Sequence, residues 1–224
     1  MRLSEVFATI QGEGVLSGVP SLFIRTTGCN LRCRWCDTPY TSWNPEGEDW
    51  PLDRIINWVE GFPLYRHVVV TGGEPMLPDE IGSLCRELRT SGRHITIETA
   101  GTIYRDVACD LMSISPKLAN STPDGAWAER HESLRLQGSI LRRLVSEYSY
   151  QLKFVVCSPD DLAEIKAVVD STAALPERVL LMPEGAQPEI LRERARWLVE
   201  VCKQTGYRYC PRLHIELWGS RRGV

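Results

Sequence analysis

The sequence predicts an α/β fold in which parallel strands alternate with helices and curve into an incomplete (β/α)6-type barrel. Six short apolar or β-branched runs are bounded by turn residues, which is typical of strands. Amphipathic helical patterns lie between most of these runs, and strand alternating with helix implies parallel strands joined by crossovers. Six units are fewer than the eight of a closed barrel. A doubly wound open sheet is the alternative.

The predicted elements follow one another along most of the chain. The runs that predict strands are apolar along their whole length, as expected when helices cover both faces of a sheet. The predicted strands are residues 21–27, 67–73, 94–99, 110–115, 150–156 and 178–183. Helices are predicted, from apolar residues spaced three or four apart, at residues 53–60, 78–90, 159–169 and 188–202. Residues 119–138, rich in Asn, Ser, Pro, Asp and Gly, predict a long loop.

Length and composition indicate a soluble globular protein. The 224 residues suffice for one core, so we expect a single domain over 1–224. The net charge of -3 gives no reason to expect a nucleic-acid or membrane partner. No apolar run approaches the roughly 20 residues that cross a bilayer, and the first residues lack the apolar core of a signal peptide. We therefore expect a cytoplasmic protein.

Three cysteines follow the first predicted strand directly. Cys29, Cys33 and Cys36 have the spacing C-x3-C-x2-C, and three thiols so close together cannot all pair as disulfides. Metal or cluster ligation is therefore the leading interpretation. A structural zinc site needs a fourth ligand, such as Asp37, His67 or a distant cysteine. A 4Fe-4S cluster held by three cysteines leaves one iron open to an outside ligand.

Polar or glycine-rich stretches also follow the next three predicted strands. They are residues 72–75 (GGEP), 98–102 (ETAGT) and 115–117 (SPK). Parallel α/β folds bind ligands at the carboxyl ends of their strands. We therefore expect these stretches and the three cysteines to form one site.

The cysteine spacing, with Trp35 directly before the last cysteine, is similar to the signature of the radical S-adenosylmethionine superfamily. Residues 72–75 resemble the GGEP motif of the same superfamily. The resemblance implies a 4Fe-4S cluster whose open iron chelates the methionine part of S-adenosylmethionine. Cleavage of this cofactor gives a 5'-deoxyadenosyl radical, so no protein side chain is the catalytic group. It also implies an external electron donor of the flavodoxin or ferredoxin type.

Longer stretches resemble the 7-carboxy-7-deazaguanine synthase family within that superfamily. They are residues 7–14, 23–29, 36–38, 71–73, 98–99, 115–117, 152–153 and 217–224. The resemblance implies a lyase that converts 6-carboxy-5,6,7,8-tetrahydropterin to 7-carboxy-7-deazaguanine by a radical ring contraction with loss of ammonia. It implies Mg²⁺ as a further cofactor and a place in 7-deazapurine biosynthesis, of the queuosine type. The alternative is another radical enzyme, such as a glycyl-radical activating enzyme.

The same resemblance implies roles for individual residues. Cys29, Cys33 and Cys36 match the cluster ligands, and Thr38 matches a magnesium contact. Arg25 matches a pterin contact, and an arginine in so apolar a strand is costly unless it meets an anion. The implied substrate-binding residues are Ile10, Gln11, Gly12, Glu13, Arg25, Thr71 and Val224. The implied cofactor-binding residues are Trp35, Asp37, Gly73, Glu74, Ser115, Pro116, Lys117, Met182, Pro183 and Glu184.

Two positions depart from the family pattern, and one expectation concerns assembly. Ala100 and Met182 stand where relatives carry polar residues, so the sequence does not define the adenosine contacts there. An incomplete barrel leaves a sheet edge exposed, and dimerisation would cover it. We therefore expect a homodimer.

Overall fold

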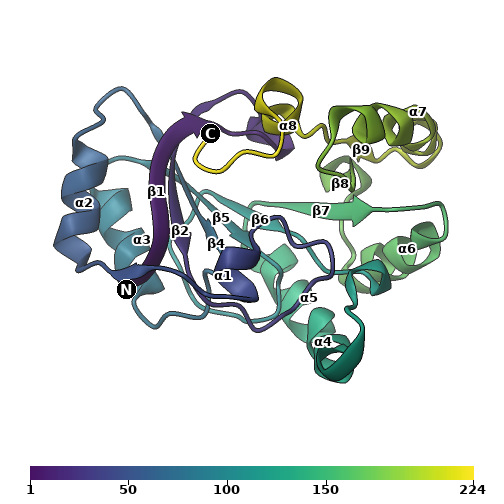
Figure 1. Ribbon diagram of the computed structural model, residues 1–224, viewed down its shortest axis with the longest axis horizontal. Helices are drawn as coiled ribbons and strands as arrows, with labels where there is room; N and C mark the ends of the chain where they lie inside the picture. Colours follow the sequence, from purple (N-terminus) through teal and green to yellow (C-terminus); the bar gives the residue numbers. More distant parts are fainter.

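The computed structural model describes all residues from Met1 to Val224 and contains one nine-stranded sheet (Figure 1). The strand order is β3-β1-β2-β4-β5-β6-β7-β8-β9, and every pair from β2 to β9 is parallel. The six predicted strands are confirmed as β2 (Pro20–Thr26), β4 (His67–Gly72), β5 (His94–Thr99), β6 (Leu111–Ile114), β7 (Tyr150–Val156) and β8 (Val179–Pro183). They lie side by side in chain order without closing, which confirms the incomplete (β/α)6-type barrel.

Three strands were not predicted from the sequence. Strand β1 (Arg2–Ile10) pairs antiparallel with β2, and its burial is only partial along most of its length. Because it lies near the edge, it lacks the continuous apolar run that identifies the central strands. The outermost strands are β3 (Glu48–Asp49) and β9 (Arg208–Tyr209), each of two residues.

All four predicted helices are present, with boundaries shifted by a few residues. They are α2 (Leu52–Glu60), α3 (Ile81–Thr90), α6 (Asp161–Thr172) and α7 (Pro188–Thr205). Four further helices are α1 (Pro39–Ser42), α4 (Ala128–Arg135), α5 (Gly138–Glu147) and α8 (Leu213–Trp218). Single 3-10 turns are η1 (Gly14–Leu16), η2 (Ala119–Ser121), η3 (Gly125–Trp127) and η4 (Pro176–Arg178).

The prediction of a long loop over residues 119–138 is wrong where α4 forms. His131 is the only buried residue of α4, so this helix has no apolar stripe for a periodicity argument to detect. None of the helices combines the length and the apolar composition that crossing a membrane requires.

The main core is a cluster of 32 buried hydrophobic residues that joins the strands to the covering helices. Strand β7 is buried along its whole length, and β4 is buried from His67 to Thr71. The last helix, α8, and the C-terminal tail after it run back past the end of β1 (Figure 1). The tail therefore closes one side of the sheet end where the predicted site lies.

Candidate active site

A cavity of about 580 Å³ opens at the carboxyl ends of the parallel strands, where polar stretches were predicted to meet. Its lining comes from the ends of β1, β2, β4, β5 and β6 and the segments after them, from β7 and β8, and from the chain after β9, including the C-terminal tail. The predicted site residues that line it are Ile10, Gln11, Gly12, Glu13, Arg25, Cys29, Cys33, Trp35, Cys36, Asp37, Thr38, Thr71, Gly73, Ser115, Lys117, Met182 and Val224. Folding therefore brings most of the predicted site together.

The three clustered cysteines are the only cysteines that line this cavity. Burial raises the pKa of Cys29 to about 12 and that of Cys33 to about 11, so both thiols are protonated until a metal displaces the proton. Three thiols around one cavity, without a fourth, fit a 4Fe-4S cluster with an open iron.

The backbone of the cysteine loop is held by the polar segment that includes α4. Arg32 donates its backbone N–H to His131 Nδ1 at 3.1 Å, so the other ring nitrogen of His131 carries the proton and donates to Ser121 Oγ at 2.9 Å. Arg34 donates its backbone N–H to the Ser121 carbonyl at 2.9 Å. The buried His131 of α4 thus positions the backbone of the cysteine loop.

The glycines of the GGEP stretch allow β4 to approach the start of the cysteine loop. A Cβ atom on Gly73 would lie 2.1 Å from the carbonyl oxygen of Gly28. The backbone N–H of Glu74 donates to that same oxygen at 2.9 Å, and the N–H of Gly73 donates to Thr26 at 3.2 Å. Only a residue without a side chain fits at position 73.

Four predicted cofactor-binding residues lie outside the cavity lining. Glu74 is fully buried, and its carboxylate accepts hydrogen bonds from Thr99 Oγ1 at 2.7 Å and from the Ala100 N–H at 2.9 Å. Burial raises its pKa. Glu184 forms an ion pair with Arg194. The four are Glu74, Pro116, Pro183 and Glu184.

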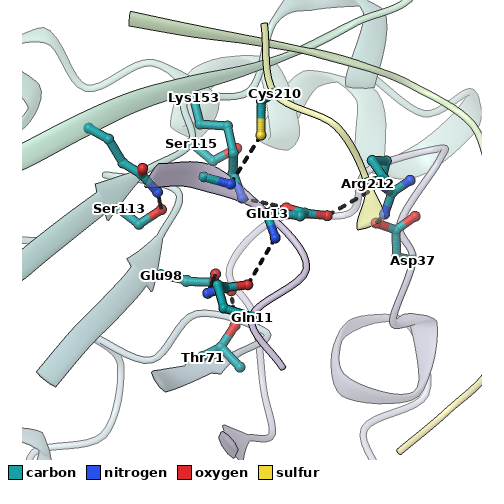
Figure 2. A network of polar contacts seen from close by, with 12 residues as sticks. Gln11, Glu13, Asp37, Thr71, Glu98, Ser113, Ser115, Lys153, Cys210 and Arg212 are labelled. Carbon is teal, nitrogen blue, oxygen red and sulfur yellow. Dashed lines mark hydrogen bonds and ion pairs between the residues drawn. The ribbon is translucent and has the colours of Figure 1, made fainter. Parts of the chain in front are cut away.

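On one wall of the cavity, Glu98 receives two hydrogen bonds (Figure 2). Gln11 Nε2 donates to Glu98 Oε1 at 3.1 Å, and Thr71 Oγ1 donates to Glu98 Oε2 at 3.0 Å. The side-chain oxygen of Gln11 accepts the backbone N–H of Glu13 at 3.1 Å. The orientation of the Gln11 amide is therefore fixed from both ends, and so is that of the Glu98 carboxylate.

Next to this wall, Glu13 meets two buried cations (Figure 2). It pairs with Lys153 and accepts from Arg212 Nε at 3.2 Å, and these partners are only 5% and 3% exposed. Burial by itself would raise the pKa of Glu13, but the two cations outweigh it and hold that pKa well below 4.5. Arg212 also pairs with Asp37 and donates to the Gly185 carbonyl at 2.7 Å. One guanidinium thus joins segments that follow β1, β2 and β8.

Arg25 of β2, which pairs in register with Thr71 of β4, has one ion-pair partner and two amino groups without a hydrogen bond. Its Nε donates to Glu5 Oε1 at 2.7 Å, whereas its terminal nitrogens make no hydrogen bond. Thr38 and the C-terminal residue Val224 line the same cavity. The cavity can therefore offer a guanidinium edge and a hydroxyl to an anion and a hard cation.

Several cavity-lining residues had no role assigned from the sequence. They are chiefly Glu98, Lys153, Arg212 and His214. Lys153 lies within the apolar strand β7, so the argument applied to Arg25 would have found it too. Arg212 and His214 lie near the C-terminus, in a stretch where no element was predicted, and their partner Glu13 is about 200 residues away. Spacing along the chain carries no signal for such contacts.

Fold and site together define the class of this protein. Residues 23–135, which run from β2 through the cysteine loop to α4, match the family model of the Radical SAM superfamily. Solved structures agree: SuiB from Streptococcus suis shares the fold, with a TM-score of 0.57 and 14% sequence identity over 86% of this chain and 48% of that one. The protein is a radical SAM enzyme, a class that uses a 4Fe-4S cluster and S-adenosylmethionine.

Full-length relatives define the family more narrowly. The chain is 44% identical to 7-carboxy-7-deazaguanine synthase of Halobacterium salinarum, over 98% of this chain and 91% of the relative. It is 45% identical to the enzyme of that name from Rhodopirellula baltica, over 100% and 89%. The crystal structure of QueE from Escherichia coli superposes with a TM-score of 0.71 at 25% identity, over 95% and 94%. The chain belongs to the 7-carboxy-7-deazaguanine synthase family.

Proposed function

We propose that the protein converts 6-carboxy-5,6,7,8-tetrahydropterin to 7-carboxy-7-deazaguanine with loss of ammonia, as a step in 7-deazapurine biosynthesis. The observation that carries the proposal is that one cavity is lined both by the three clustered thiols and by side chains suited to a carboxylated pterin. The reaction requires cofactor and substrate in direct contact, and a shared cavity provides this. The full-length relatives named for this reaction support the proposal.

On the cofactor side, we assign Cys29, Cys33 and Cys36 as the cluster ligands. When bound, the cluster and S-adenosylmethionine supply the one-electron chemistry that removes a hydrogen atom from the substrate. Lys117 donates from Nζ to the carbonyl and the hydroxyl of Ser115, both at 2.8 Å, so this cation is held at the cavity wall. There it can face the methionine carboxylate of S-adenosylmethionine.

On the substrate side, Arg25 binds the pterin carboxylate with its two free amino groups. A bidentate guanidinium–carboxylate pair gives both affinity and orientation. Gln11 and Glu98 then present an amide and a carboxylate to the aminopyrimidine edge, which carries both N–H donors and acceptors. Thr71 and Gln11 already donate to Glu98. The protein groups that bind the aminopyrimidine edge are therefore preorganised before the substrate arrives.

Mg²⁺ belongs to the carboxylate end of the cavity in this proposal. The ion takes hard oxygen ligands and keeps several waters, and the Thr38 hydroxyl, the substrate carboxylate and water meet that requirement. Val224, matched to a substrate contact, lies in the same lining. Asp37 is already engaged by Arg212.

Other parts of the assignment stay predictions. They are an electron donor of the flavodoxin or ferredoxin type, a homodimer, a cytoplasmic location and a single radical SAM domain over 1–224. The contacts assigned to Glu74, Pro116, Pro183 and Glu184 also stay predictions, since these residues lie outside the cavity lining.

Product formation by anaerobically reconstituted protein tests the proposal. The protein is incubated with 6-carboxytetrahydropterin, S-adenosylmethionine, Mg²⁺ and a reductant, and 7-carboxy-7-deazaguanine is detected by mass spectrometry. Cys33→Ala should abolish the product, whereas Cys109→Ala, which removes a thiol outside the cavity, should keep it. Slow cleavage of S-adenosylmethionine without product would contradict the substrate assignment and favour another radical enzyme, such as a glycyl-radical activating enzyme.

A further inference from the structure

Glu5 is a carboxylate behind the cavity wall that accepts hydrogen bonds from three separate parts of the chain. It lies on β1 opposite Arg25 of β2. Its Oε1 accepts from Arg25 Nε at 2.7 Å and from the Tyr40 hydroxyl at 3.0 Å, and its Oε2 accepts from Arg222 Nε at 3.1 Å. The Glu5 side chain is 13% exposed. The contacts with Arg25 and Tyr40 are therefore partly shielded from water and from salt, whereas the contact with Arg222, which is 44% exposed, lies at the surface.

Each of the three residues that donate to Glu5 either is assigned to bind the substrate or Mg²⁺ or lies two residues from one that is. Arg25 is itself the proposed carboxylate ligand. Tyr40 lies two residues after Thr38, and Arg222 lies two residues before Val224. We propose that Glu5 is a positioning residue that assembles this end of the site by holding all three groups in register.

The C-terminal tail shows why such an anchor matters. Arg222 makes all the side-chain hydrogen bonds and ion pairs of residues 219–224, to Glu5, to Glu46 at 3.0 Å and to Ser4 at 3.4 Å. Its guanidinium carbon also lies 4.0 Å from the centre of the Tyr40 ring. Glu46 is 59% exposed and so contributes little by itself. Glu5, at 13% exposure the less exposed of the two carboxylates, is the partner that holds residues 219–224 over the cavity.

Glu5 orients Arg25 without competing for the surface that the substrate uses. The ion pair engages Nε, and both terminal amino groups of Arg25 stay free. A long side chain fixed in advance loses less conformational entropy when its ligand binds. The carboxylate of Glu5 therefore strengthens substrate binding although its charge has the same sign as that of the substrate.

This inference rests on the proposed function, and Glu5→Gln tests it. The variant keeps the shape of the side chain but removes its charge and turns one acceptor into a donor. We expect the KM for 6-carboxytetrahydropterin and the Mg²⁺ concentration for half-maximal rate to rise about tenfold, the loss of one charge-assisted hydrogen bond. Iron content and cleavage of S-adenosylmethionine without the pterin should be unchanged. Glu48→Gln on the adjacent strand β3, outside the cavity lining, is the matched control.

Backbone NMR order parameters of residues 219–224 give a second reading that needs no turnover. They should be lower in Glu5→Gln than in Glu48→Gln, because Arg222 loses its less exposed partner. A wild-type protein that makes no product would refute the proposed function, and the order parameters would still test the anchor. A KM in Glu5→Gln equal to or below that of Glu48→Gln overturns the positioning role, even if the tail is more mobile. Unchanged order parameters in the tail overturn the anchor.

Discussion

Glu13 shows how a carboxylate can stay charged inside this protein. Its side chain is 15% exposed, and two nearly buried cations, Lys153 and Arg212, face it. Removing one member of such a group leaves the others uncompensated, which costs more than the group contributes as a whole. Arg212 also pairs with Asp37, which directly follows Cys36. A substitution of Glu13 that moves Arg212 therefore also affects the cysteine loop.

The first prediction is that Glu13→Gln lowers the free energy of unfolding at pH 7 by about 3 kcal/mol, since Lys153 and Arg212 lose their shared counter-ion. The pKa of Glu13 is lower in the folded than in the unfolded state, so its contribution is present above pH 4.5 and is lost as the pH falls below that value. The difference between wild type and variant should therefore shrink on acidification. Urea unfolding of wild type and variant, at pH 7 and at a pH below 4.5, measures this difference in the free energy of unfolding. A difference that does not change with pH would contradict the ion pairing.

The second prediction concerns His67, which lies between β2 and β5 at the other end of the sheet. Its Nδ1 is 2.7 Å from Ser21 Oγ and its Nε2 is 2.7 Å from Thr96 Oγ1, a pattern that suits the neutral ring. Burial lowers its pKa to about 4. The stability it contributes is complete above pH 6.5 and is lost as the pH falls toward 4. NMR should find the ring neutral at pH 5.5, and titration near pH 6.5 would count against this packing.

At the scale of the elements, the glycine turn after β4 and the cysteine loop after β2 depend on each other. A Gly73→Ala methyl group would meet the Gly28 carbonyl at 2.1 Å and the Cβ of Cys29 at 2.9 Å. The Gly28 oxygen belongs to the backbone and the Cys29 Cβ is bonded to it, so neither can rotate away. The glycine turn and the cysteine loop would therefore have to move apart.

The third prediction is therefore that Gly73→Ala costs about 1–3 kcal/mol of stability and lowers the iron and sulfide bound after reconstitution. Gly82→Ala in α3 is the control, since its methyl group would meet the end of the Arg86 side chain at 3.4 Å and the Asp106 carbonyl oxygen at 3.6 Å, both without a clash. That change should be neutral or slightly stabilising, because alanine favours helix. Equal iron content in both variants would refute the dependence of the two segments on each other.

The sequence predicted the strands whose burial is uniform, and it missed strand β1 and helix α4, whose burial is partial or polar. The six central strands are almost wholly buried, so a continuous apolar run identified each of them. Strand β1 is half-buried, and α4 buries only His131, so neither has a clear period. For these two, partners distant in the sequence decide the conformation.

The residues of the candidate site also fall into two groups, those that the sequence could predict and those that it could not. Cys29, Gly73 and Arg25 could be singled out because each is chemically unusual in its local context. Glu5 and Arg212 could not, since a charged residue in a half-buried strand or near a chain end is ordinary. Their partners, Arg222 and Glu13, are 217 and 199 residues away along the chain.

In the whole molecule, the open barrel brings segments from across the chain together around one cavity. Because the sheet does not close, it has two edge strands at which another chain could pair. The two outer strands, β3 and β9, have only two residues each, with Glu48, Asp49 and Arg208 among the four. Short charged edges resist pairing with other strands. The homodimer therefore stays a prediction that the sheet edges themselves do not require.

The central claim is that one cavity holds the radical cofactor against the pterin, and hydrogen transfer between the two tests it most directly. The fourth prediction is that 6-carboxytetrahydropterin deuterated at C6 yields 7-carboxy-7-deazaguanine, with deuterium appearing in the recovered S-adenosylmethionine. Direct abstraction of hydrogen by the cofactor radical and its return within one cavity give this result. Product without any deuterium in S-adenosylmethionine would contradict the account.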